Sequence, residues 1–229
     1  MPRHLHVTRR AVLGGASWAA VALVSTAVAP ATASVRPSAP AAAARRRASH
    51  NGWTIEEQVD DVSTVWTRPV SGTAMTVPVR LGVAEALLIH LVRRMHYEIT
   101  PLLPGDLTGW EPLGSMSTLS PASNLASGTA VRVRPGARSD AYFPFQETVL
   151  RDILADAHGA IRWGGDDIDR DDSLFYLVEG PYDMHTAEVA QQLRAAAEAP
   201  GQGSGVVHDP LITARRSAAQ ALQRRQSGR

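Results

Sequence analysis

The chain has 229 residues, of which 23 are basic and 22 acidic, so its formal net charge is +1 at neutral pH. This balance argues against a nucleic-acid-binding protein, which would normally be more basic. The sequence contains no cysteine, which excludes a disulfide framework and a lipid-anchored N-terminal cysteine. All of the basic residues are arginine, a bias typical of a GC-rich genome.

Residues 1–33 predict export. Thr8-Arg9-Arg10 is followed by an apolar Ala/Val/Leu run to about Ala29, which is the pattern of a twin-arginine signal peptide. An ordinary secretory signal with two chance arginines is the alternative. Small residues at Ala31-Thr32-Ala33 suit a signal peptidase, so we expect the mature chain to begin near Ser34 and to carry a net charge of about −2. Contact with a membrane is expected only through the signal peptide before cleavage.

The rest of the chain predicts one domain between two flexible segments. Residues 34–49 are rich in Ala, Pro and Arg and cannot bury enough apolar surface to fold, so we expect a disordered linker. Residues 50–200 carry the periodic apolar patterns of a domain. Residues 201–229 return to Gly, Ser, Arg and Gln, which predicts a flexible basic tail in which 214–223 could form an isolated helix.

Strand and helix patterns follow one another within 50–200 without a strict β-α-β rhythm. This order favours a single α+β domain, which we expect to contain a small, mostly antiparallel sheet packed with about three helices. Pro78 suggests that the first strand lies at a sheet edge, and Asp183 is the predicted N-cap of the last helix. The predicted strands are 74–79, 129–133, 160–163 and 174–178, and the predicted helices are 83–96, 145–157 and 183–198.

The segment from Ser123 to Arg132 resembles a zinc-peptidase motif that has lost its ligands. Ser123, Gly128 and Ala130 match the motif S-x-H-x-x-G-x-A-x-D of the peptidase M15 family, the D-alanyl-D-alanine carboxypeptidases and related peptidoglycan endopeptidases. Leu125 stands where this family has its first histidine ligand. Arg132 stands where it has an aspartate ligand.

The second half of the family motif falls on the run from Asp171 to Phe175. The family has an acidic catalytic base three positions before its third ligand, a histidine, which an aromatic residue follows. Asp171 keeps the position of the base and Phe175 that of the aromatic residue, but Leu174 replaces the histidine. The resemblance, which is to actinobacterial members, spans roughly residues 50–200 and implies an M15-type fold with all three zinc-ligand positions degenerate.

The resemblance therefore implies a scaffold whose zinc chemistry is missing. Leucine donates nothing to a metal, and a permanent charge at Arg132 repels a divalent cation. We expect no cofactor, an idle Asp171, and an exported pseudo-peptidase at the cell wall that binds peptidoglycan stem peptides or a cell-wall protein without hydrolysis. One alternative is an active zinc D,D-carboxypeptidase or endopeptidase that recruits other ligands, although no histidine stands in a paired motif. Another is a domain kept only for protein contacts.

Five residues are candidates to line the cleft of such a domain. We expect Arg132 to pair with Asp171 or Asp172 across the old metal site, because a guanidinium can bridge carboxylates; a solvent-facing Arg132 is the alternative. The acidic run 166–172 is interpreted as a solvated loop. The cleft candidates are Ser123, Arg132, Asp171, His96 and Trp163.

Overall fold

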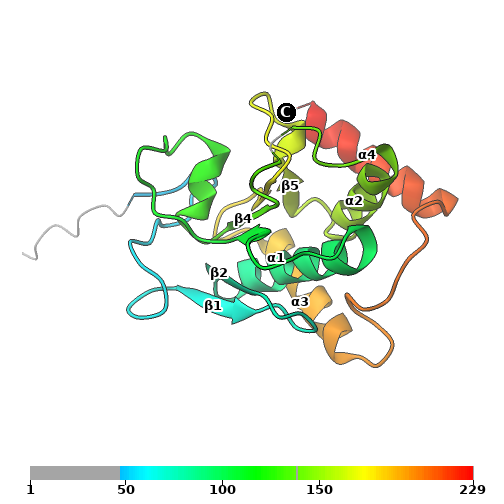
Figure 1. The fold of residues 1–229 in the computed structure, drawn as a ribbon, viewed down its shortest axis with the longest axis horizontal. Helices are drawn as coiled ribbons and strands as arrows, with labels where there is room; N and C mark the ends of the chain where they lie inside the picture. The colour runs from blue at the N-terminus through cyan, green and yellow to red at the C-terminus, as the bar shows by residue number, and fades with distance from the viewer. Residues whose placement is uncertain (1–46, 138, 229) are drawn as a thin grey trace, which may run out of the picture. The chain divides into compact units, whose positions relative to one another are not determined.

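The computed structural model describes residues 47–137 and 139–228 (Figure 1). The predicted signal peptide and nearly all of the predicted linker lie outside the described residues. The predicted α+β arrangement is confirmed, since α-helices are combined with two small antiparallel sheets. Four α-helices are described: three correspond to the helices predicted in the domain, and the fourth to the helix considered at 214–223; the strands form two sheets in place of one. Within the described part of the chain, no helix has the length and apolarity needed to cross a membrane.

The smaller sheet pairs β1 (Val65–Pro69) with β2 (Thr76–Arg80). The strands are antiparallel, with Val65 opposite Arg80 and Thr67 opposite Pro78. The strand predicted around Pro78 is therefore present and lies in a two-stranded sheet, where each strand is an edge.

The larger sheet has the order β3 (Leu107–Thr108), β4 (Ala130–Val133), β6 (Leu174–Leu177), β5 (Ile161–Trp163), with every neighbouring pair antiparallel. Side chains alternate between the two faces of a strand. One face packs against the helices in the main hydrophobic core and carries Val131, Val133, Ile161, Trp163, Phe175 and Leu177. The register places Ala130, Arg132, Arg162, Leu174 and Tyr176 on the opposite face.

The helices supply the rest of this core. They are α1 (Val83–Arg94), α2 (Pro144–Asp156), α3 (Met184–Glu198) and α4 (Thr213–Ser227). All four contribute to the hydrophobic cluster that the sheet joins. Helix α1 continues into a π-helical turn, η1 (Met95–Ile99). The predicted N-cap is confirmed, because Asp183 Oδ1 accepts a hydrogen bond of 2.6 Å from Thr186 N.

Helix α4 corrects the prediction of a flexible tail from residue 201. It contacts α2, beside which it runs in Figure 1, and buries Leu222 in the main core. Its last turn is also bound to the sheet: Gln226 Nε2 donates to Ile161 O at 2.9 Å, and Arg162 Nη1 donates to Gln226 O at 2.5 Å. The tail has few apolar residues, so composition alone could not reveal partners that lie far away in the sequence.

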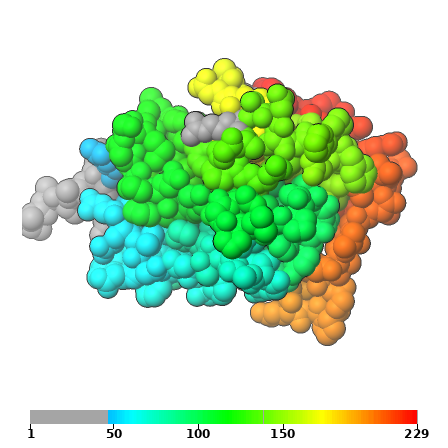
Figure 2. Space-filling model, in the orientation of Figure 1, coloured from blue at the N-terminus to red at the C-terminus, as the bar shows by residue number. Residues whose placement is uncertain are grey.

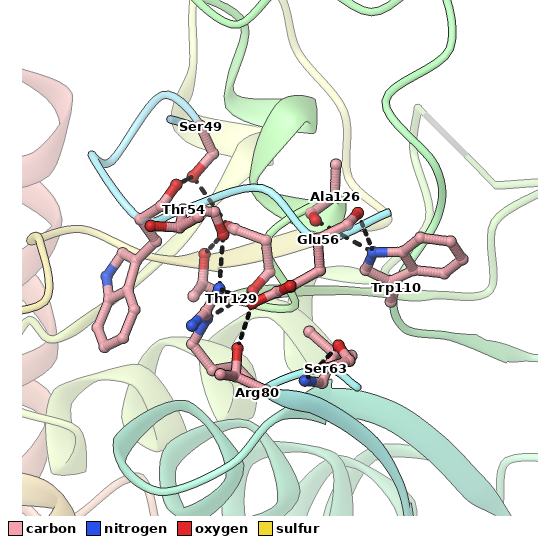
Figure 3. Close-up of polar contacts among 12 residues, drawn as sticks. Ser49, Thr54, Glu56, Ser63, Arg80, Trp110, Ala126 and Thr129 are labelled. Carbon is pink, nitrogen blue, oxygen red and sulfur yellow. Dashed lines mark hydrogen bonds and ion pairs between the residues drawn. The ribbon is translucent and has the colours of Figure 1, made fainter. Parts of the chain in front are cut away.

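A buried polar network fixes the first described residues of the domain (Figure 3). The disordered linker was predicted to extend to residue 49, so it was expected to include Ser49. Ser49 Oγ lies 2.9 Å from Ser127 Oγ. Arg80 donates from Nε to Ser127 O at 2.9 Å and from Nη2 to Thr54 O at 2.5 Å. Two of these three bonds meet at Ser127, so they hold the middle of the Ser123–Arg132 segment.

Gly128 has a structural reason to be glycine. Its φ is +69°, a conformation that residues with a Cβ rarely adopt, and a Cβ at this position would lie 2.7 Å from Arg80 N. Its carbonyl accepts a hydrogen bond of 2.8 Å from the same nitrogen. The close approach joins the motif loop to strand β2.

Candidate functional site

A groove of about 1060 Å³ lies over the face of the larger sheet that is turned away from the main core. Four side chains on this face belong to strands β4, β5 and β6 and line the groove: Arg132, Arg162, Leu174 and Tyr176. The remaining lining comes from residues 120–122, the acidic loop at 167–171, the strand end at 178–179, and His50. The loop, yellow in Figure 2, projects from the domain surface.

The three positions that the M15 resemblance equates with zinc ligands lie close together, two of them lining the groove and Leu125 packing against Leu174. Arg132 and Leu174 are direct cross-strand neighbours on β4 and β6. Leu125 ends the 3-10 helix η2 (Pro121–Leu125), is fully buried, and packs with Leu174, Ala130 and Tyr176 in a small hydrophobic cluster separate from the main core. Positions that are far apart in the sequence therefore meet on one face of the sheet.

Arg132 forms the predicted ion pair, and its partner is Asp171. Arg132 Nη1 donates to Asp171 Oδ2 and, at 3.1 Å, to Ser173 Oγ. The Arg132 side chain is only 8% exposed, so the alternative of a solvent-facing arginine is wrong. Asp172 takes no part in this pair. It is buried, and it accepts hydrogen bonds from Arg170 Nε at 2.7 Å and from Ala141 N at 3.1 Å.

Asp171 is held as an anion. Burial acts to raise its pKa, but hydrogen bonds from Ser173 and the ion pair with Arg132 outweigh this effect, so its pKa lies below the ordinary value of 3.8. Ser173 donates to Asp171 Oδ1 from its hydroxyl at 2.6 Å and from its backbone N–H at 3.2 Å. A carboxylate with a lowered pKa and occupied oxygens is a poor proton acceptor, which makes Asp171 unsuited to general-base catalysis.

The acidic loop is not the solvated loop that its sequence suggested. Arg162 Nε donates to Asp167 Oδ1 at 2.6 Å, and Arg151 pairs with Asp166. With the pairs of Asp171 and Asp172, four carboxylates of the loop bind arginines from β4, from β5, from α2 and from the loop itself. Of the aspartates in the run, only Asp169 has no hydrogen-bond or ion-pair partner among the residues that the structure describes.

Tyr176 and His50 form the part of the groove next to Asp167. Tyr176 Oη donates to Asp167 Oδ2 at 2.9 Å, and burial together with the nearby Asp167 charge raises the pKa of Tyr176. The rings of His50 and Tyr176 meet edge to face with centroids 6.3 Å apart. Ser123 lies behind them, fully buried, and its Oγ accepts a hydrogen bond of 2.9 Å from His50 N. Ser123 therefore positions His50 and does not itself line the groove.

The other two cleft candidates lie away from the groove. His96 belongs to the turn η1, where its Nδ1 accepts a hydrogen bond of 3.0 Å from Leu102 N. Trp163 is buried in the main core, and its Nε1 donates to Asp172 O at 2.8 Å. The expectation fails for Trp163 because strand alternation turns it toward the helices and turns its neighbour Arg162 toward the groove.

Sequence reasoning missed several groove residues, among them His50, Arg162 and Tyr176. Two of them could have been predicted from the alternation of side chains between the two faces of a strand. Tyr176 is two residues after Leu174 and so shares its face, and Arg162 is the residue of β5 opposite Tyr176. No sequence pattern links His50 to this face, because a long-range hydrogen bond to Ser123 places it there.

Zinc, which the family resemblance implies, does not fit these residues. Leu125 and Leu174 have no donor atom, and the guanidinium of Arg132 is a permanent cation bound to Asp171. Across residues 47–137 and 139–228, no group of three or more His, Cys, Asp or Glu side chains is arranged to hold a metal ion.

Comparison with known proteins returned no match: no family model, no curated protein and no solved structure is significantly similar to this chain.

Proposed function

We propose that this protein is an exported pseudo-peptidase of the M15 type, whose groove binds peptidoglycan stem peptides without hydrolysing them. The main support is that the three positions corresponding in the resemblance to the family's zinc ligands lie close together: Arg132 and Leu174 line the groove, and Leu125 packs against Leu174. Two are leucines, and the third is an arginine paired with the residue at the position of the catalytic base. With two leucines and a paired arginine at these positions, the groove keeps its shape but has no metal to activate a water molecule.

The composition of the groove suits a short peptide. Ala122, Leu174 and Val178 offer apolar surface to methyl groups, such as those of alanine residues. Tyr176, His50 and the loop carboxylates add polar groups around this surface. Most of the lining residues are polar or charged, so the groove offers hydrogen-bonding groups to a peptide backbone beside this limited apolar surface.

Export and the cell-wall location belong to the same proposal. They depend on the signal-like pattern of residues 1–33, since peptidoglycan lies outside the cytoplasmic membrane. Recovery of the protein from the culture medium or the wall fraction, with its mature N-terminus near Ser34, is the expected result.

Calorimetric titration of the purified protein with a synthetic stem peptide ending in D-Ala-D-Ala tests the binding. We expect saturable binding with no released D-alanine. The variant Ala122→Trp narrows the groove at a half-buried lining position, so it should weaken binding at least about tenfold, or about 1.4 kcal/mol. Leu119→Trp is the matched control, because Leu119 is exposed on the same loop and does not line the groove.

Two outcomes contradict the proposal. Absence of binding at millimolar peptide would leave the groove without its proposed ligand and favour a domain kept for protein contacts. Cleavage of the peptide that a chelator abolishes would favour the active zinc carboxypeptidase.

A further inference from the structure

A second pocket of about 600 Å³ adjoins the groove. Its walls come from the end of α2, the beginning of α3 and the inner side of α4. Arg162, Val178 and Glu179 line both the pocket and the groove. Since the two hollows share these three residues, they form neighbouring parts of one depression along β5 and the end of β6.

Two buried polar atoms in the walls of this pocket have no hydrogen-bond partner within the described chain: Thr186 Oγ1 and Gln226 Oε1. Thr186 is 1% exposed and Gln226 is 6% exposed. The Gln226 amide cannot turn freely, because its Nε2 donates to Ile161 O. A buried polar atom without a hydrogen-bond partner destabilises the fold, so the pocket is suited to a ligand that brings hydrogen-bonding groups.

The charges of the pocket favour an uncharged ligand. The titratable lining residues are two arginines, Arg162 and Arg225, two carboxylates, Glu179 and Asp183, and two histidines, so the formal charges cancel when His158 and His185 are neutral. Arg162 is bound to Asp167 and Asp183 caps α3, which leaves neither as a strong charge for a ligand. Small side chains in the walls help to leave the volume open: Ala155, Ala160, Ala218 and Ala221.

We infer that this pocket is a second subsite for the ligand of the groove, and that it binds a neutral unit carrying hydroxyl and amide groups, such as an N-acetylated sugar. The inference rests on the proposed function, since the stem peptides of peptidoglycan are attached to N-acetylated sugars. The preferred ligand is then a sugar-linked peptide that occupies both hollows. A free peptide occupies only the groove.

The test compares two ligands by calorimetry: the stem peptide alone, and the same peptide attached to its N-acetylated disaccharide. We expect the natural protein to bind the sugar-linked peptide at least about tenfold more tightly. Ala221→Trp fills the pocket from a half-buried position of α4, so it should abolish this preference and leave the affinity for the free peptide unchanged. Gln220→Trp, at an exposed neighbouring position outside the pocket, should keep the preference.

Ala218→Trp is a second variant at an exposed lining position, for use if Ala221→Trp does not fold. Equal binding of the two ligands, or a preference that both pocket variants retain, overturns the subsite while the proposed function stands. Failure of both ligands to bind overturns the two together.

Discussion

Two clusters of buried arginines in this protein have the same chemistry and different surroundings. At the groove, Arg132 pairs with Asp171 on the open face of the larger sheet. Among the helices, Arg94 donates to Glu98 at 2.6 Å and to Asp156 at 2.5 Å, and Arg215 of α4 donates to Asp152 and Asp156 at 2.6 and 2.7 Å.

The helix cluster is a brace, because it joins α1, η1, α2 and α4 and leaves the Arg94 side chain only 2% exposed. The Arg132 pair joins β4 to the start of β6 beside a groove that can admit a ligand. A buried arginine with carboxylates is therefore not by itself a sign of a site. Its position relative to an open hollow distinguishes the two clusters.

The sharpest test of this distinction is to rebuild a metal site at the groove. Leu125→His, Arg132→Asp and Leu174→His together place three potential ligands where the positions converge, so the triple variant should bind about one zinc ion per chain. Elemental analysis after dialysis against trace zinc measures this. The double variant that keeps Arg132 is the control and should bind far less, because it offers two ligands beside a fixed cation. Near-stoichiometric zinc in the natural protein would contradict the pseudo-peptidase proposal.

Removing the brace should have the largest effect on stability. Arg94→Met leaves Glu98, whose side chain is almost fully buried, without its cation, while Asp152 keeps its ion pair with Arg215; this should lower the free energy of unfolding by about 3–5 kcal/mol. Urea denaturation measures the loss. Arg93→Met is the control on the same helix, because Arg93 has no ion pair among the described residues, and a change below about 1 kcal/mol is expected.

If Arg94→Met does not fold, Arg215→Gln gives the same comparison. Arg215 is partly exposed, so its loss should cost about 1–2 kcal/mol. If the free energies of unfolding of Arg94→Met and Arg93→Met agree within error, the arginine cluster among the helices does not stabilise the fold as proposed.

Breaking the groove pair should cost less and depend on pH. Asp171→Asn removes an anion whose pKa lies below 3.8, so the variant should be less stable at neutral pH by about 1–3 kcal/mol. A carboxyl group whose pKa is lowered in the folded state stabilises the fold at pH values above its ordinary pKa. This contribution disappears as the pH falls through the folded-state pKa. The difference in unfolding free energy between the two proteins should therefore shrink below pH 3.8.

Asp169→Asn is the control for the groove pair, because its exposed carboxylate has no partner in the described part of the chain. It should match the natural protein at every pH. A pH-independent difference for Asp171→Asn would show that the aspartate acts through packing and not through its charge.

Local signals predicted much of this fold. The helix predicted at 145–157 is α2 at Pro144–Asp156, and the N-cap at Asp183 is present, because apolar periodicity and capping depend on neighbours in the sequence. The docking of α4 and the division of the strands into two sheets could not be predicted, since both depend on partners far along the chain.

The site was predicted in part for the same reason. The family resemblance singled out Leu125, Arg132 and Leu174, which the fold brings together. The chemistry of a guanidinium suggested that Arg132 pairs with Asp171 or Asp172, and the structure shows the pair with Asp171. Trp163 was wrongly chosen as a cleft residue in place of Arg162, because the prediction did not consider which face of the strand each side chain occupies.

The alternation of the larger sheet has a consequence for mutational tolerance. Strands β4 and β6 carry core residues on one face and groove residues on the other. Substitutions on the groove face can change the chemistry while the core stays intact. Insertion or deletion of one residue within either strand would exchange the two faces, burying Arg132 or Tyr176 in the core. A scan of variants in these strands should therefore recover many substitutions and almost no changes in length.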